Sequence, residues 1–101
     1  MNEPSFAVIV PVYNSARYLK ETLDSLFAQT YKNFTVIAVD DGSTDDSINI
    51  LKDYERKSYP IKVLAKPNGG VSSARNFALN YIEAEKRFDY VCFVDSDDIV
   101  T

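Results

Sequence analysis

Four apolar stretches alternate along the chain with segments in which apolar residues recur at intervals of three or four positions. The apolar stretches predict strands at 6–12, 34–39, 61–65 and 89–95. The amphipathic segments between them predict helices at 15–28, 45–57 and 71–86. Strands that alternate with helices in this way predict a Rossmann-like β-α-β-α-β-α-β fold, with a mostly parallel four-stranded sheet flanked by helices.

The strands at 6–12 and 91–94 are almost continuously apolar, which is typical of parallel strands covered on both faces. We therefore expect both strands to be buried, and Cys92 to be a buried structural thiol. Asn14 or Ser15 is expected to cap the first helix, and Ser43 or Thr44 the second. The third helix should bury an apolar stripe composed of Val71, Ala74, Phe77, Ala78, Tyr81 and Ile82.

The composition is that of one globular domain covering residues 1–101, with 46% hydrophobic and 26% charged residues. The net charge is −4, yet seven of the fifteen acidic residues lie in two short clusters, and without them the charge would be +3. No basic stripe is present, which argues against a nucleic acid partner. The chain has no histidine, a single cysteine and no apolar run long enough to cross a membrane, so we expect a cytoplasmic location.

The first acidic cluster, with Asp40, Asp41, Asp45 and Asp46, begins at the end of the second predicted strand. The second, Asp95-Ser96-Asp97-Asp98, begins at the end of the fourth. Because parallel strands end at one edge of the sheet, where ligands bind in open α/β folds, the clusters should be neighbours in space. A carboxylate at Asp40 or Asp41 suits a ring N–H donor such as that of uracil, thymine or guanine. A turn with a helix cap is the alternative for this cluster.

The second cluster suits a divalent cation, Mg²⁺ or Mn²⁺, that bridges phosphate groups. Two carboxylates about 5 Å apart repel by roughly 3 kcal/mol at an effective dielectric constant near 20, and a cation removes that cost. We take Asp95, Asp97 and Asp98 as the candidate metal ligands. A solvated turn in which Asp97 or Asp98 caps a helix is the alternative.

Other residues predicted at the same edge could complete a site. Arg75 offers a fork of donors for a phosphate or a base edge, and Gly69 and Gly70 allow a ligand to approach the backbone. Each also has a structural interpretation: Arg75 as a surface helix residue, and Asn68-Gly69-Gly70 as a plain connection. Tyr13, which follows Pro11 and Val12 at the end of the first strand, could simply cover the edge of the core.

Taken together and in order, four motifs resemble family 2 glycosyltransferases of the GT-A fold. They are Val10-Pro11-Val12-Tyr13-Asn14, Val39-Asp40-Asp41-Gly42-Ser43-Thr44-Asp45, Asn68-Gly69-Gly70 with Ala74-Arg75-Asn76, and Asp95-Ser96-Asp97-Asp98. The resemblance covers the whole chain. It implies a nucleotide-sugar donor, usually a UDP-sugar, a carbohydrate or lipid-linked acceptor, and sugar transfer with inversion at the anomeric carbon.

The resemblance also implies roles for individual residues. Pro11 and Tyr13, with Val12 between them, would border the base, and Asp41 would bind it with Asp40 adjacent. Arg75 would lie near the base or diphosphate, close to Gly69 and Gly70. Asp95 and Asp97, on either side of Ser96, would form the Asp-x-Asp motif that contacts the ribose and the metal, with Asp98 as a further metal ligand.

In this family the acceptor site and the general base lie beyond the Asp-x-Asp motif, and the sequence contains no evident candidate for that base. We therefore expect the chain to be the donor-binding half of a longer enzyme, or a truncated piece of one, and to be inactive in transfer by itself. The longer protein could associate with the cytoplasmic face of a membrane. An incomplete sheet would leave an edge open to self-association.

Four other classes of protein are alternatives to a glycosyltransferase. A non-catalytic nucleotide-binding module, or an inactive fragment, would use the same site without chemistry. A nucleotidyltransferase-like domain would carry a glycine-rich, basic stretch after the first strand. A phospho-acceptor receiver domain would place its acidic pair there, and a dinucleotide-binding domain would carry Gly-x-Gly-x-x-Gly. The chain instead has Pro11-Val12-Tyr13-Asn14 at that position.

Overall fold

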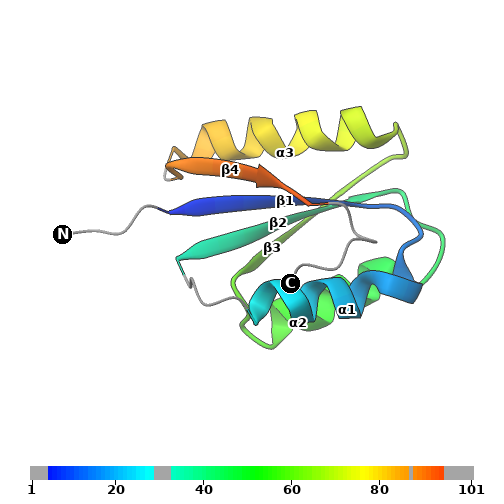
Figure 1. Ribbon diagram of the computed structural model, residues 1–101. Coiled ribbons are helices and arrows are strands. Elements are labelled where there is room, and N and C mark those ends of the chain that lie inside the picture. The colour runs from blue at the N-terminus through cyan, green and yellow to red at the C-terminus, as the bar shows by residue number, and fades with distance from the viewer. Residues whose placement is uncertain (1–4, 29–32, 87, 95–101) are drawn as a thin grey trace.

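A computed structural model describes residues 5–28, 33–86 and 88–94, which form a sheet enclosed between helices (Figure 1). The elements in chain order are β1 (Phe6–Val12), α1 (Ala16–Phe27), β2 (Phe34–Asp41), α2 (Ser47–Arg56), β3 (Ile61–Lys66), α3 (Val71–Glu85) and β4 (Tyr90–Phe93). The predicted order and type of all seven elements are confirmed.

The four strands form one sheet in the order β3-β2-β1-β4, and every neighbouring pair is parallel. Phe6 of β1 pairs with Phe34 on one side and with Tyr90 on the other. All carboxyl ends of the strands therefore lie at one edge of the sheet, as the alternation of strands and helices predicts.

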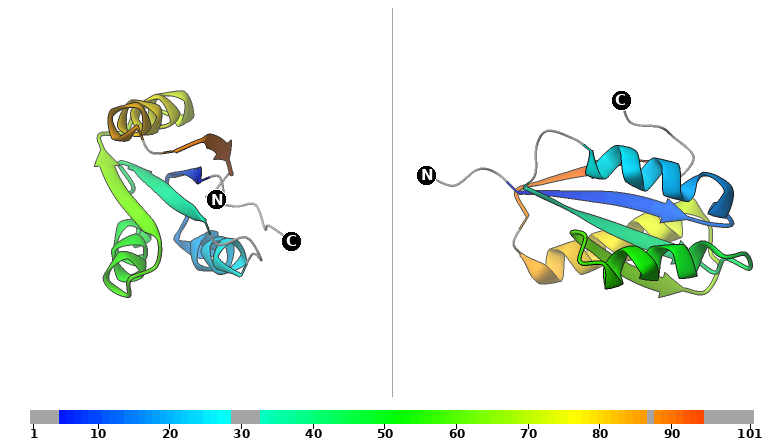
Figure 2. Two further views of the ribbon diagram at one scale, coloured as in Figure 1. Left: turned by 90° about the vertical axis from the view of Figure 1, so that its left-hand side faces the viewer. Right: turned by 90° about the horizontal axis from the view of Figure 1, so that it is seen from below.

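Helices α1 and α2 cover one face of the sheet and α3 covers the other (Figures 1 and 2). Alternate residues of β2 serve the two layers, because side chains along a strand point to opposite faces. Val36 and Ala38 pack toward α1 and α2, whereas Ile37 and Val39 pack toward α3. The first layer is closed by Leu19, Leu23, Leu26, Leu51 and Tyr54, and the second by Ala74, Ala78 and Ile82.

The predicted N-cap position is confirmed for α1 but not for α2. Ser15 occupies the N-cap position of α1, as expected, and its hydroxyl donates to the carbonyl oxygen of Tyr13 at 3.1 Å. Helix α2 begins later than predicted, after Asp46, so the expectation that Ser43 or Thr44 caps it is wrong. Both residues instead bond to Asn14, across from the end of β1.

Strand β4 is not buried, which contradicts the expectation from its apolar sequence. All four of its residues are exposed, including Cys92, so the predicted buried thiol is also wrong. The physical reason is position: β4 is an edge strand, and α3 packs over β1 and β2. Phe77, predicted in the buried stripe of α3, is likewise 40% exposed.

Candidate functional site

The carboxyl edge of the sheet brings together the ends of β1, β2 and β3. Val12 pairs with Asp40, and Asp41 pairs with Lys66, at the last positions of the three strands. The ends of β1, β2 and β3 therefore meet at this edge, as the alternation of strands and helices predicts. Asp40 and Asp41 are both buried, with 5% and 3% of the residue surface exposed.

The carboxylate of Asp41 is held by the segment that connects β3 to α3. Its Oδ1 atom accepts hydrogen bonds from the Nζ atom of Lys66 at 2.7 Å and from the backbone N–H of Gly69 at 3.0 Å. Its Oδ2 atom accepts from the N–H of Gly70 at 2.8 Å, with a longer contact of 3.4 Å from the Asn68 side chain. The Asn68 amide also donates to the carbonyl oxygen of Asp41 at 3.1 Å.

Several effects determine the ionisation of Asp41. Burial raises the pKa of this carboxyl, because a charge loses its hydration there. The hydrogen bonds and charge of Lys66, with the N–H groups of Gly69 and Gly70, act in the opposite direction and prevail, so the pKa lies below its usual value. Asp41 is consequently a carboxylate at neutral pH, with its position fixed by a loop.

Asp40 differs from its neighbour because its side chain points to the other face of the sheet. Its Oδ2 atom accepts from the backbone N–H of Ser43 at 3.3 Å. Its Oδ1 atom is buried and accepts no hydrogen bond from any residue that the structure describes. A buried carboxylate oxygen without a donor is costly, so this atom is a candidate acceptor for a ligand.

Asn14 connects the end of β1 to the loop after β2, a role that the sequence-based analysis did not assign to it. Its side-chain oxygen accepts from the N–H groups of Thr44 at 2.7 Å and Asp45 at 3.3 Å. Its own N–H donates to the Ser43 hydroxyl at 2.9 Å. Asn14 has a φ of 47°, in the left-handed region where asparagine is enriched.

Two glycines allow the loops of this edge to approach each other closely. A Cβ atom on Gly42 would lie 2.7 Å from the backbone nitrogen of Asn68, and the φ of Gly42 is 75°. A Cβ atom on Gly69 would lie 2.8 Å from the Ser73 hydroxyl and 3.0 Å from the Nζ atom of Lys66. The Asp40-Asp41-Gly42 turn and the 67–70 loop therefore form one packed rim.

The remaining predicted site residues occupy different environments at this rim. Pro11 and Val12 are buried in β1, whereas Tyr13, directly after the strand, is half-exposed. Arg75 lies in the first turns of α3, partly buried, and its guanidinium carbon is 5.3 Å from the centre of the Phe93 ring. Arg75 thus connects α3 to β4, at a position suited to a group bound between them.

The acidic cluster at Asp95, Ser96, Asp97 and Asp98 lies outside the described residues. The chain leads toward the same edge, since the N–H of Val94 donates to the carbonyl oxygen of Ile9 at 2.9 Å. Within residues 5–28, 33–86 and 88–94, three or more potential metal-ligating side chains do not cluster anywhere.

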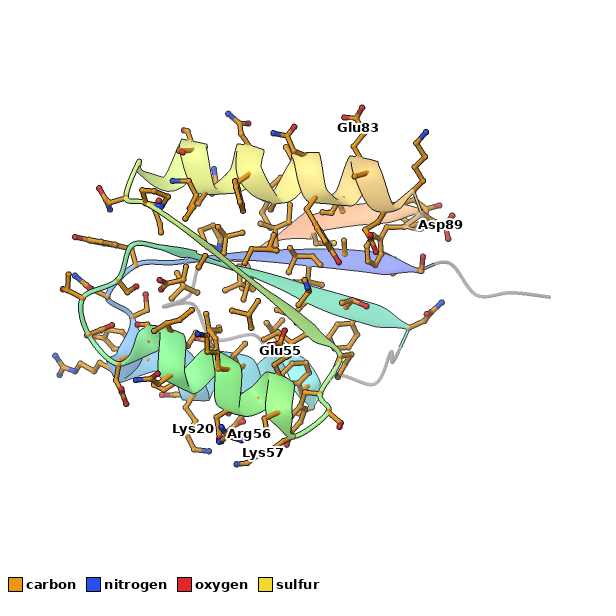
Figure 3. The ribbon with its side chains drawn as sticks, turned by 180° about the vertical axis from the view of Figure 1, so that it is seen from behind. Lys20, Glu55, Arg56, Lys57, Glu83 and Asp89 are labelled. Carbon is orange, nitrogen blue, oxygen red and sulfur yellow. The ribbon has the colours of Figure 1, made fainter. Side chains whose placement is uncertain are left out.

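A hollow with a volume of about 600 Å³ lies between α1 and α2. Side chains of both charge signs line it, including Lys20, Asp53 and Lys57. Figure 3 shows Lys20, Arg56 and Lys57 projecting outward on this side of the molecule, whereas Asp89 lies at the opposite, amino-terminal edge of the sheet. No described helix is long and apolar enough to cross a membrane.

A parallel sheet with carboxylates at its carboxyl edge is typical of α/β domains that bind ligands at that edge. The model of the family "Glycosyl transferase family 2" matches residues 7–101. The chain therefore belongs to glycosyltransferase family 2, which confirms the resemblance inferred from the four motifs.

One curated relative and two solved structures illustrate this membership. The minor teichoic acid biosynthesis protein GgaB of Bacillus subtilis is 44% identical over 109 residues, which span 100% of this chain and 12% of GgaB. A structure of S. aureus TarS 1–349 in complex with UDP-GlcNAc is 41% identical, with a TM-score of 0.79, and covers 92% of this chain and 26% of that one.

The mannosyltransferase PcManGT from Pyrobaculum calidifontis, in complex with GDP-Man and Mn²⁺, is 27% identical with a TM-score of 0.82. The match covers 95% of this chain and 28% of that one. These neighbours confirm the predicted GT-A fold class. In each comparison the chain spans less than a third of its relative's length.

Proposed function

We propose that the chain binds the nucleotide-sugar donor of an inverting glycosyltransferase, and that the donor is a UDP-sugar. The observation that carries this proposal is the ionised, loop-held carboxylate of Asp41 at the carboxyl edge of the sheet. The likeness to TarS, whose structure holds UDP-GlcNAc, supports it. The likeness to PcManGT, whose structure holds GDP-Man, makes a guanine nucleotide the competing donor.

The proposed roles of the residues follow from their positions at the rim. Asp41, with Asp40 beside it, would accept the base N–H, while Pro11, Val12 and Tyr13 would border the base. Gly69 and Gly70 would bring their backbone close to the nucleotide. Arg75 would contact the base or the diphosphate, because a guanidinium donates in a planar fork.

We propose that Asp95, Asp97 and Asp98 hold a Mn²⁺ or Mg²⁺ ion, and that Asp95 and Ser96 also contact the nucleotide. Carboxylate oxygens are suitable ligands for both ions. A metal bound there would act as a Lewis acid on the leaving diphosphate. The Mn²⁺ in the PcManGT structure supports this part of the proposal.

The acceptor and the general base are proposed to belong to a longer protein. The relatives are several times the length of this chain, and GgaB takes part in teichoic acid biosynthesis, which suggests a carbohydrate or lipid-linked acceptor. We expect the isolated chain to bind nucleotide without transferring sugar. A cytoplasmic location is part of the proposal, because a chain with one cysteine needs no internal disulfide.

Calorimetric titration of UDP, GDP and ADP into the purified chain, each with and without Mn²⁺, tests this function. We expect saturable UDP binding that requires the metal, with GDP weaker and ADP not bound. Asp97→Asn should remove the metal dependence and most of the affinity, whereas Asp89→Asn, at the opposite edge of the sheet, should leave both unchanged. Absence of binding by all three nucleotides would refute the proposal, and detectable sugar transfer by the chain would refute its inactivity.

A further inference from the structure

Lys66 ends β3 with its ammonium group buried against the rim. Its Nζ atom donates to Oδ1 of Asp41 at 2.7 Å and to the carbonyl oxygen of Pro67 at 2.6 Å. The side chains of Lys66 and Asp41 are only 10% and 4% exposed. Lysine is rarely buried unless it is paired, so the ion pair with Asp41 accounts for the burial of this side chain.

Lys66 differs from the other partners of Asp41 in carrying a charge. The N–H groups of Gly69 and Gly70 and the amide of Asn68 are neutral donors. A buried carboxylate loses its hydration and becomes easier to protonate unless a cation compensates for that loss. Lys66 supplies such a cation, in direct contact with the carboxylate of Asp41.

Three other charged side chains near Lys66 occupy different positions. Asp40, which precedes Asp41, is acidic and directs its side chain to the opposite face of the sheet. On α3, the guanidinium of Arg75 lies over the Phe93 ring. Lys62, on the same strand as Lys66, is exposed near the other end of β3.

The loop has the shape that this ammonium group requires. A Cβ atom on Gly69 would lie 3.0 Å from Nζ of Lys66, so a larger residue there would shift the ammonium group by a few tenths of an ångström. The same glycine donates its N–H to the oxygen of Asp41 that Lys66 contacts. The Asp41 carboxylate is therefore held jointly by the ammonium group of Lys66 and the backbone of Gly69.

We propose that Lys66 is a positioning residue for nucleotide recognition, which keeps Asp41 ionised and fixed so that a carboxylate always faces the base. This inference rests on the proposed nucleotide-binding function. Lys66 need not touch the nucleotide. Its effect passes through Asp41, which becomes a weaker acceptor for a base N–H once the carboxyl takes up a proton, because one of its oxygens then carries an O–H donor.

The test compares Lys66→Met and Lys66→Arg with the parent chain, using Lys62→Met as the matched control. The first measurement is the pKa of Asp41 without nucleotide. It is obtained from the ¹³C chemical shift of the Asp41 carboxyl group in an NMR pH titration. We expect Lys66→Met to raise this pKa, and Lys66→Arg and Lys62→Met to leave it close to the parent value.

The second measurement is the Kd for UDP with Mn²⁺ at pH 7.5 and at pH 5.0, expressed as the ratio of the variant to the parent. The ratio cancels the protonation of UDP itself, which is common to both proteins. We expect a ratio of about ten for Lys66→Met at pH 7.5, the loss expected from removing a charged hydrogen-bond partner, and a larger ratio at pH 5.0. Lys66→Arg should restore most of the affinity, and Lys62→Met should give a ratio near one.

The outcomes separate this inference from the function on which it rests. If the parent does not bind UDP, the proposed function fails, whatever the pKa titration shows. If the parent binds and Lys66→Met has the same Asp41 pKa, or a Kd ratio that does not change with pH, the positioning role is overturned. A raised pKa together with a ratio that grows toward pH 5.0 supports it.

Discussion

The side-chain oxygen of Asn14 lies 2.7 Å from the backbone nitrogen of Thr44, which joins two loops that are thirty residues apart in the sequence. The same oxygen accepts from the N–H of Asp45, and the backbone at Asn14 has a φ of 47°. Asn14 therefore stabilises the rim both through hydrogen bonds and through its tolerance of a left-handed conformation.

Substitutions at Asn14 should separate these two contributions. Asn14→Gly keeps the conformation and loses the hydrogen bonds, and we expect a loss of about 1–2 kcal/mol in the free energy of unfolding. Asn14→Ala should lose about 1 kcal/mol more, because alanine is strained at positive φ. Urea unfolding measures both. Equal losses for the two variants would show that the conformation of Asn14 contributes nothing.

A comparison of Gly42 with Gly70 tests how closely the two loops of the rim approach each other. Both have positive φ, at 75° and 94°, but only a Cβ atom on Gly42 would collide with Asn68, since nothing lies within 4 Å of one on Gly70. Gly70→Ala should cost about 1–3 kcal/mol for backbone strain alone. Gly42→Ala should cost clearly more in the same unfolding measurement, and a smaller loss would contradict the packed rim.

Asp45 should make stability depend on acid pH. Its carboxylate accepts from the N–H groups of Ala16 at 3.1 Å and Ser47 at 2.9 Å. Burial raises its pKa, but the bonds from Ser47 and Ala16 outweigh that effect, so the pKa lies below the ordinary value of 3.8. A lowered carboxyl pKa stabilises the fold above about pH 4, and this stabilisation is lost as the pH falls through the folded-state value.

Asp45→Asn should therefore flatten the decline of the free energy of unfolding between about pH 4 and pH 2. The measurement is urea unfolding at a series of pH values. Asp46→Asn, at the neighbouring exposed position, is the control and should retain the parent's slope. An unchanged slope in Asp45→Asn would exclude these hydrogen bonds as a source of acid sensitivity.

Strand β4 is the element where we propose self-association. Among the described strands it pairs with β1 alone, and it exposes Tyr90, Val91 and Phe93. An apolar edge strand is a template for a further strand. We expect reversible, concentration-dependent association in sedimentation velocity, and Val91→Lys should weaken it.

Leu79→Lys is the matched control for this experiment. Leu79 is as exposed as Val91, at 38%, but lies on α3. It should leave the association unchanged. A parent chain that stays monomeric at all concentrations, or equal effects of the two variants, would refute association through β4.

The fold could be predicted because its signals are local and regular. The apolar stretch that forms β1 begins and ends where expected, at Phe6 and Val12, and each helix lies within one or two residues of its predicted bounds. The exposure of β4 could not be predicted in this way, because an apolar strand has the same sequence pattern whether or not other elements cover it. Position in the sheet is a property of the whole topology.

The site could be predicted in part for a similar reason. Parallel strands must end at one edge, so the meeting of Asp41 with the Gly69-Gly70 loop followed from the strand order. Lys66 and Asn14 were missed, because a lysine at a strand end and an asparagine after a strand are common in any sequence. Their importance comes from partners 25 and 30 residues away, which only the folded chain brings into contact.

Binding of a uridine nucleotide at the carboxyl edge of the sheet should be visible in ¹H–¹⁵N NMR spectra of the chain titrated with UDP and Mg²⁺. We expect the amide signals of Asp41, Gly69, Gly70 and Arg75 to shift in a saturable manner, and those of Lys57 and Tyr59 to stay in place. Shifts confined to the hollow between α1 and α2, or no saturable shifts at all, would contradict it.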